Sequence, residues 1–278
     1  MTDLARVESA LAGAPTDANG IIELVQGVMV HPFLVGLYGI ELSAERSDDV
    51  QTRSAADIVE RMLDIDPRPL TYGREPDMRF AGNCRHFSVL TVALLRRAGV
   101  PCRARCGFGG YFEAGRWVDH WVVERWDDDR WVMLDAQIDV RQRAAMHIDF
   151  DTTDMPPGMF LNAAEAWQHC RSGDEDGQRF GILDMWGEWF IAGNVGRDFA
   201  ALNKVEMLPW DGWGDLSSEG KPPGGDAEVD DVAAVVVRDD FDEVRQRYDS
   251  DAGLRVPTRV VAFATPTGPR EVEVSDVI

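Results

Sequence analysis

The stretch Gly82-Asn83-Cys84-Arg85-His86-Phe87 decides how this chain is interpreted, because it marks the start of a helix. Behind it, apolar residues recur at the spacing of one helix face: Phe87, Leu90, Leu94 and Leu95. Asn83 is one of the residue types that cap helix starts, and Gly99 followed by Pro101 ends the pattern. We therefore predict a helix that begins at Cys84 and runs to Ala98.

Cys84 would occupy the first turn of this helix, a position that changes the chemistry of a thiol. The unpaired backbone N–H groups and the positive end of the helix dipole lie there. Both favour the thiolate, which is the nucleophilic form of cysteine. The alternative is a small buried residue at a helix start, since free cysteine is among the most buried residue types.

The apolar pattern changes after this helix to that of strands, at 103–108, 117–126 and 130–134. His120 lies in the second strand, and Asp135 follows the third. Two antiparallel strands joined by the short turn 127–129 can place these residues side by side. Asp135 would then hold one ring nitrogen of His120 while the other faces Cys84. A half-exposed strand histidine and an aspartate at a strand end are the alternatives for each residue alone, but the combination favours a catalytic triad.

The same stretches resemble the core of the transglutaminase-like superfamily over roughly Leu70 to Asp139. The resemblance is carried by four segments: Gly82-Asn83-Cys84-Arg85, Leu-Leu-Arg-Arg-Ala-Gly-Val-Pro-Cys-Arg at 94–103, His-Trp-Val-Val-Glu at 120–124 and Trp-Val-Met-Leu-Asp at 131–135. It implies an α+β, papain-like fold in which the nucleophile helix packs on an antiparallel sheet. It also implies that Cys84 is the nucleophile, that His120 shuttles the proton and that Asp135 orients His120.

Such an enzyme attacks an amide or thioester carbonyl and passes the acyl group to an amine or to water. The family includes protein cross-linkers, peptidases, peptide N-glycanases and enzymes that form amides of small molecules, so membership does not choose the reaction. A cysteine amidase or peptidase and a non-catalytic binding module with the same fold stay open. Arylamine N-acetyltransferases share the order of the triad, but their Arg-Gly-Gly-x-Cys approach is absent from residues 80–84.

The chain departs from the cross-linking transglutaminases in one respect. Those enzymes resemble one another in a tryptophan upstream of the cysteine that helps to bind the oxyanion, whereas the first tryptophan here is Trp117. The backbone N–H of Cys84 is one expected donor to the oxyanion. Tyr72 and Asn83 are guesses for the second donor, with a structural role as the alternative for each.

The remaining cysteines and histidines predict no metal or cofactor site. His86 lies two residues after Cys84, but Cys-x-His lacks the paired spacing of structural zinc sites, and no fourth ligand is evident. Cys102 and Cys106 would share one side of a strand, where direct bonding between them is geometrically poor. We expect both to serve packing.

Composition restricts the partners of this protein. Across 278 residues, 49 Asp and Glu stand against 28 Lys and Arg, a net charge of -21, which argues against binding nucleic acid or an anionic membrane surface. A cationic amine acceptor is compatible with this charge, and we expect a small-molecule or peptide substrate. The sparse cysteines and the absence of a basic, apolar leader favour the cytoplasm. The longest apolar stretch, 21–30, is too short for a membrane span of about 20 residues.

Changes in composition along the chain suggest four segments. Helical patterns at 5–11, 21–30 and 55–63 predict an N-terminal helical segment over 1–65 that packs on a catalytic core over 66–214, with further helices at 163–170 and 186–192. Pairs of Ser, Pro and Gly predict a linker over 215–228. The rest, 229–278, is a small αβ appendage. It has a strand at 233–237 or a helix after it, and a hairpin of 260–264 with 271–274.

Overall fold

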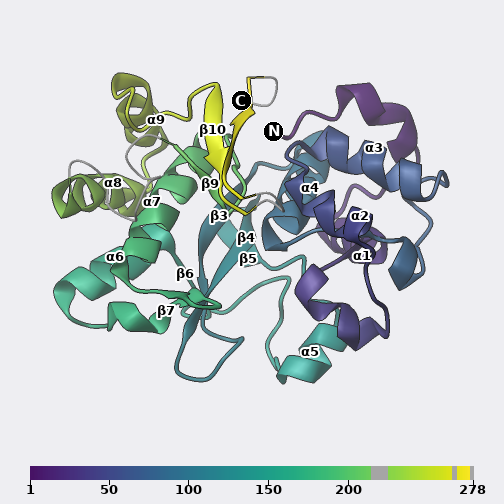
Figure 1. Cartoon of the computed structure of the whole chain (residues 1–278), viewed down its shortest axis with the longest axis horizontal. Helices are drawn as coiled ribbons and strands as arrows, with labels where there is room; N and C mark the ends of the chain where they lie inside the picture. The colour runs from purple at the N-terminus through teal and green to yellow at the C-terminus, as the bar shows by residue number, and fades with distance from the viewer. Residues whose placement is uncertain (214–224, 265–267, 276–278) are drawn as a thin grey trace. The chain divides into compact units, whose positions relative to one another are not determined.

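The computed structural model describes residues 1–213, 225–264 and 268–275 (Figure 1). The chain forms two compact units, residues 1–104 with 122–156 and residues 105–121 with 157–278. The division between them runs through two strands, β3 (Cys102–Gly109) and β4 (Trp117–Asp127). Helices and strands occur in both units, so the predicted α+β class is confirmed.

The first unit is built around α4 (Cys84–Arg97), which is buried from Cys84 to Leu95. A helix that is buried on all sides needs neighbours around it. Two of them are α1 (Ala18–Val28) and α3 (Ala55–Ile65), which both contact α4 (Figure 1). The side chains of Asp17, Ser54 and Asn83 cap these three helices at their N-termini. The predicted helices that begin near Ala55 and Cys84 are therefore confirmed.

The hairpin of β4 and β5 (Arg130–Leu134) also belongs to this unit. Its antiparallel ladder runs from Val123 opposite Leu134 to Asp127 opposite Arg130. Asp128 turns the chain with a φ of 54°, a left-handed conformation that Asp tolerates better than most residues. The predicted bounds of β5 and the turn at 127–129 are both confirmed.

Shorter elements complete the first unit. The two-residue strands β1 (Met29–Val30) and β2 (Phe80–Ala81) pair in parallel, and β2 lies directly upstream of α4. The predicted helix over 21–30 therefore ends early, because Met29 and Val30 are extended. The other elements are η1 (Ala5–Leu11), η2 (Pro32–Tyr38), α2 (Ala44–Ser47), η3 (Asp48–Gln51), η4 (Pro76–Met78) and α5 (Val140–Met146).

The larger sheet has the strand order β6-β3-β4-β7-β8, with β5 also paired to β4. β6 (Phe160–Asn162), β7 (Phe180–Ile182) and β8 (Met185–Trp186) belong to the second unit. β7 runs parallel to β4, with Trp117 opposite Phe180, so the expectation of an antiparallel sheet is wrong at this pair. A parallel pair needs a long crossover, which the residues between the two strands supply.

Helices α6 (Ala163–Ser172), α7 (Glu188–Leu202) and α8 (Asp226–Arg238) pack against one another in the second unit (Figure 1). Asn162 caps α6, with Glu165 completing a capping box. β10 (Arg259–Ala262) and β11 (Arg270–Glu273) are antiparallel, so the predicted pairing near the C-terminus is confirmed. The remaining elements are η5 (Gly177–Arg179), β9 (Asp211–Gly212), which pairs with β10, and α9 (Phe241–Ser250).

Three local expectations need correction. The strand considered at 233–237 is wrong, because these residues lie in α8, whose buried valines share one helix face. The helix expected at 186–192 begins at Glu188 and continues to Leu202, while Trp186 lies in β8. Of the linker expected over 215–228, residues 215–224 lie outside the described residues, and α8 already begins at Asp226. The four-segment division remains a prediction.

Candidate active site

Cys84 is the first residue of α4, as its sequence context predicts. Asn83 precedes it in an extended conformation, and its side-chain Oδ1 accepts a hydrogen bond from the backbone N–H of Arg85 at 3.1 Å. Only 7% of the Cys84 surface is exposed. The thiol therefore lies at a capped helix start, largely shielded from solvent.

His86 completes the cap of α4 rather than serving as a metal ligand. Its Nε2 donates to the carbonyl oxygen of Thr52 at 2.8 Å, and its Nδ1 accepts from the backbone N–H of Asn83 at 3.2 Å. This is a capping box in which His takes the place usually held by Glu or Gln. Burial holds the pKa of His86 well below its ordinary value of 6.5, so the ring is neutral.

Gly82 lies two residues before α4, where neighbouring atoms leave too little room for a side chain. Its N–H donates to the carbonyl oxygen of Val30 at 3.0 Å, which continues the ladder of β1 and β2. A Cβ at this position would lie 2.7 Å from Cε of Met29 and 2.8 Å from Cβ of His86. Glycine is therefore required where the backbone approaches Cys84.

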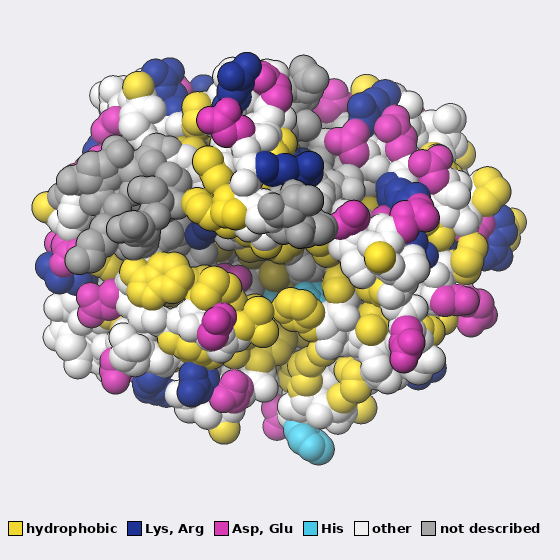
Figure 2. Space-filling view, viewed as in Figure 1, with side chains coloured by type: hydrophobic (Ala, Val, Ile, Leu, Met, Phe, Trp, Pro, Cys, Tyr) yellow, Lys and Arg dark blue, Asp and Glu magenta, His cyan; other side chains and the backbone are white. Residues whose placement is uncertain are grey.

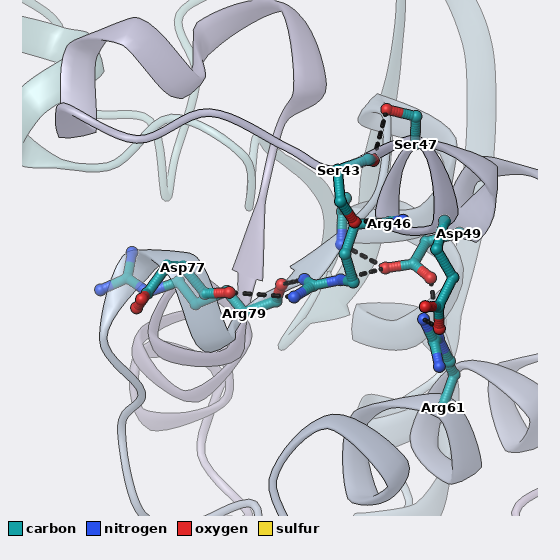
Figure 3. A network of polar contacts seen from close by, with 9 residues as sticks. Ser43, Arg46, Ser47, Asp49, Arg61, Asp77 and Arg79 are labelled. Carbon is teal, nitrogen blue, oxygen red and sulfur yellow. Dashed lines mark hydrogen bonds and ion pairs between the residues drawn. The ribbon is translucent and has the colours of Figure 1, made fainter.

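A network around Asp49 holds the segment upstream of Gly82 (Figure 3). Asp49 is buried, and its carboxylate accepts from Nε of Arg46 at 3.0 Å and from Nε of Arg61 at 2.8 Å. Arg46 also donates to the carbonyl oxygens of Asp77, at 2.9 Å, and of Arg79. The guanidinium of Arg46 thus connects the carboxylate of Asp49 to the backbone just before β2. These bonds hold the segment that precedes Cys84 in place.

His120 lies in β4 within the second unit and is 3% exposed. The ring of Phe112 meets the imidazole edge-to-face at a centroid distance of 4.7 Å, and the ring of Tyr111 does so at 6.1 Å. Asp119, the preceding residue, accepts from Nδ2 of Asn194 at 2.7 Å. Burial raises the pKa of Asp119. His120 therefore sits among aromatic rings next to a buried carboxyl group.

Asp135 follows β5 directly and is buried. Its backbone N–H donates to the carbonyl oxygen of Thr152 at 2.8 Å, and its Oδ1 accepts from the backbone N–H of Gln137 at 3.0 Å. Gln137 continues into a polar chain, because its Nε2 donates to Oε1 of Gln142 at 3.3 Å. These bonds fix both the backbone and the carboxylate of Asp135.

Cys84 and Asp135 belong to the first unit, and His120 belongs to the second. The contacts described above for each of these three residues come from its own unit. Both guesses for a second oxyanion donor stay predictions: Tyr72 is 58% exposed, and Asn83, whose Oδ1 accepts in the helix cap, would have to donate through Nδ2. The cap formed by His86 went unrecognised in the sequence, although its spacing of three residues from Asn83 is that of a capping box. Nothing in the sequence pointed to Phe112 as a neighbour of His120.

The other three cysteines are free thiols in structural surroundings. Sγ of Cys102 lies 3.5 Å from the carbonyl oxygen of Val92, and Cys106 is buried. Burial, with nearby carboxylates such as Glu188, raises the pKa of Cys170 to about 12. Cys170 is therefore protonated at neutral pH.

The described part of the chain offers no obvious metal centre and no membrane span. None of its groups of His, Cys, Asp and Glu side chains gathers three or more members in a way that could hold a metal ion. None of its helices combines the length and the apolar character needed to cross a membrane. On the face shown in Figure 2, acidic side chains are scattered among basic and apolar ones rather than gathered in one patch.

Comparison with known proteins adds one finding. Residues 46–136 match the family model of the transglutaminase-like superfamily. Neither the curated proteins nor the solved structures contain a significant match. The matched segment includes Arg46 of the upstream network, Cys84, His120 and Asp135. Members of this superfamily are generally cysteine-dependent enzymes. Over residues 46–136, the chain is therefore similar to the transglutaminase-like superfamily.

Proposed function

We propose that the protein is a cysteine-dependent acyltransferase or amide hydrolase with Cys84, His120 and Asp135 as its catalytic triad, in a papain-like arrangement. The observation that carries this proposal is the position of Cys84 at a capped helix start within the segment that matches the family. Backbone N–H groups at a helix start favour both a thiolate and an oxyanion. A shielded thiol without this setting would indicate packing alone.

The register of β4 and β5 supports the pairing of His120 with Asp135. Val123 lies opposite Leu134, so the next position of the ladder would pair Val122 with Asp135. Directly opposite residues share a face of the sheet, and so do residues two apart on one strand. If this alternation continues one position beyond the ladder, His120 and Asp135 would share a face at the diagonal spacing that side chains can bridge, as the proposal requires.

In the proposed reaction, the thiolate of Cys84 attacks the carbonyl carbon and the carbonyl electrons move to oxygen. Backbone N–H groups at the start of α4 stabilise the resulting oxyanion. When the bond to the leaving group breaks, protonated His120 gives its proton to the departing amine or thiolate. Water or an amine then attacks the thioester, His120 takes up the proton, and Cys84 leaves as thiolate.

We favour a small-molecule or peptide substrate in the cytoplasm, with an amine as acyl acceptor. The net charge of -21 would draw a cationic amine towards the protein, an effect that salt screens. Hydrolysis uses the same residues and differs only in the acceptor, so a cysteine amidase is the second candidate. The acidic surface favours transfer over hydrolysis.

Acylation by p-nitrophenyl acetate, followed by mass spectrometry of the intact protein and of its peptides, tests the triad. We expect a single acetyl group on Cys84 that disappears on adding an amine. Cys84→Ala should abolish it and keep the circular dichroism spectrum, whereas the matched variant Cys170→Ala should retain it. Acetylation that persists in folded Cys84→Ala would refute the proposal. A wild-type protein that yields only acetate at high amine concentration would indicate a hydrolase, and no acylation at all would favour a binding module.

A further inference from the structure

The connection between β3 and β4 carries two aromatic side chains that lie against His120. The ring centroids of Tyr111 and Phe112 are 4.4 Å apart, and the Phe112 ring is 4.7 Å from the imidazole of His120. Both aromatic residues are only half-buried. They therefore present apolar surface to solvent beside a buried histidine, as the aromatic side chains that line binding sites do.

The positions of these rings are built into the local backbone. A Cβ on Gly109 would lie 2.7 Å from Cε2 of Phe112 and 3.0 Å from Cε1 of Tyr111, so the rings fold over a site without a side chain. A Cβ on Gly110 would lie 2.8 Å from the ring of Trp117. Two successive glycines thus make room for three aromatic rings.

The rest of the connection is tied to neighbouring elements of the same unit. The N–H of Gly110 donates to the carbonyl oxygen of Met159 at 2.9 Å, and Nε of Arg179 donates to that of Gly115 at 2.8 Å. Trp117 stacks on Phe180 with ring planes 4° apart. The segment that carries Tyr111 and Phe112 is therefore held at both ends, and its two rings have a defined place.

We propose that Tyr111 and Phe112 form a subsite for the aromatic or other apolar body of the amine that exchanges the acyl group. This inference rests on the proposed role of His120. That residue takes the proton of the incoming amine and gives one to the leaving amine, so the amine portion of either molecule must lie beside its ring. The substituent on the amine nitrogen would then contact the rings of Tyr111 and Phe112.

The transfer step balances without a further reactant. The amine nitrogen bonds to the thioester carbonyl carbon, the bond from that carbon to the sulfur of Cys84 breaks, and the sulfur leaves as thiolate. The proton lost by the nitrogen passes to His120. Because ring-to-ring contact favours an aromatic body, we expect phenethylamine to bind better than butylamine, and methylamine not to use this subsite.

Binding can be measured at His120 independently of turnover. In NMR spectra of the protein with ¹³C-labelled histidine, the ring signal of His120 is assigned by its loss in His120→Gln. We expect phenethylamine to shift this signal but not that of His147. Phe112→Ala should weaken the binding about tenfold, as the loss of one aromatic contact predicts. The matched variant Phe241→Ala, which removes an exposed phenylalanine of α9, should leave it unchanged.

Phe112→Ala could weaken binding simply because it leaves a cavity. A second variant tests the subsite without removing either ring. Gly109→Ala would push the Phe112 ring from its place, so it should weaken phenethylamine binding while both rings remain in the sequence. Equal affinities for phenethylamine and butylamine, or an unchanged affinity in both variants, would overturn the subsite. If phenethylamine binds as expected but Cys84 is never acylated, the subsite stands and the proposed enzymatic function fails.

Discussion

Nε2 of His86 lies 2.8 Å from the carbonyl oxygen of Thr52 and thereby joins the start of α4 to the segment that precedes α3. A carbonyl oxygen only accepts, so Nε2 must carry the proton and Nδ1 is left to accept from Asn83. A doubly protonated ring would lose the bond from the N–H of Asn83, and its Nδ1–H would face Oδ1 of Asn83, which lies 2.7 Å away. Burial disfavours the doubly protonated ring, so the neutral form of His86 holds the cap beside Cys84.

The first prediction is a pH-dependent stability that originates at His86. Its pKa is well below 6.5 in the folded protein, whereas the unfolded chain takes up a proton near pH 6.5. As pH falls below that value, the unfolded state binds more protons and the folded state loses stability. Between pH 7 and pH 5.5 this group alone should lower the free energy of unfolding by about 1 kcal/mol, as measured by urea denaturation.

His86→Gln is the matched variant, because Gln can complete a capping box without titrating. In His86→Gln, the difference in the free energy of unfolding between pH 7 and pH 5.5 should be about 1 kcal/mol smaller than in wild type. His147→Asn, which removes an exposed histidine, should retain the full difference. An identical pH dependence in His86→Gln and wild type would show that folding does not lower the pKa of His86.

The second prediction concerns Asp135. Asp135→Asn keeps a side-chain oxygen that can accept from the N–H of Gln137, so we expect the fold to survive. The acylation rate should fall by about 10²-fold to 10⁴-fold, because an amide stabilises the imidazolium of His120 poorly and can select the wrong tautomer. Stopped-flow measurement of acylation checks this. Asp139→Asn, at the cap of α5, is the control that should keep the rate.

The third prediction tests the approach to Cys84. Gly82→Ala forces a methyl group against Met29 and His86 and should destabilise the protein by about 1–3 kcal/mol. Gly36→Ala places the same methyl group in open space and should change stability little. Because the nearest atom belongs to a flexible side chain, Met29→Ala should partly rescue Gly82→Ala. Additive losses in the double variant would contradict this packing.

The fourth prediction concerns a buried ion pair in the second unit. Asp198 accepts from Nε and Nη2 of Arg105 at 3.0 and 2.8 Å and also from the backbone N–H of Cys106. Asp198→Asn removes the carboxylate charge that Arg105 meets at this position, so we expect a loss of about 3–5 kcal/mol in chemical denaturation. Asp154→Asn breaks an exposed pair with Arg130 and should have little effect. Similar losses of stability in Asp198→Asn and Asp154→Asn would show that the buried pair contributes no more than the exposed one.

The sequence predicted those elements that local patterns determine. The start of α4 was recognisable from Asn83 and its end from Gly99, because caps and breakers act within one turn. β5 was bounded by a turn of three aspartates and by Asp135, which are equally local signals. Cys84 was placed at a helix start for the same reason.

Long-range contacts were harder to foresee. The parallel pairing of Trp117 with Phe180 joins residues far apart in sequence, and no local pattern encodes it. α8 was confused with a strand because its run of Ala and Val fits both a buried strand and a buried helix. The approach of Phe112 to His120 depends on how a glycine-rich connection folds back, which residue types alone do not specify.

β4 is one strand whose two halves depend on partners at very different separations along the chain. Its second half pairs with β5 across a short turn, whereas its first half pairs with β7. Closing the short loop costs less entropy, so we expect the hairpin to form earlier during folding and the pairing with β7 later. His120 lies between these two halves. The proposed site would therefore be among the last parts of the protein to mature, and a partly folded chain would carry the proposed nucleophile, Cys84, before the strand of His120 is complete.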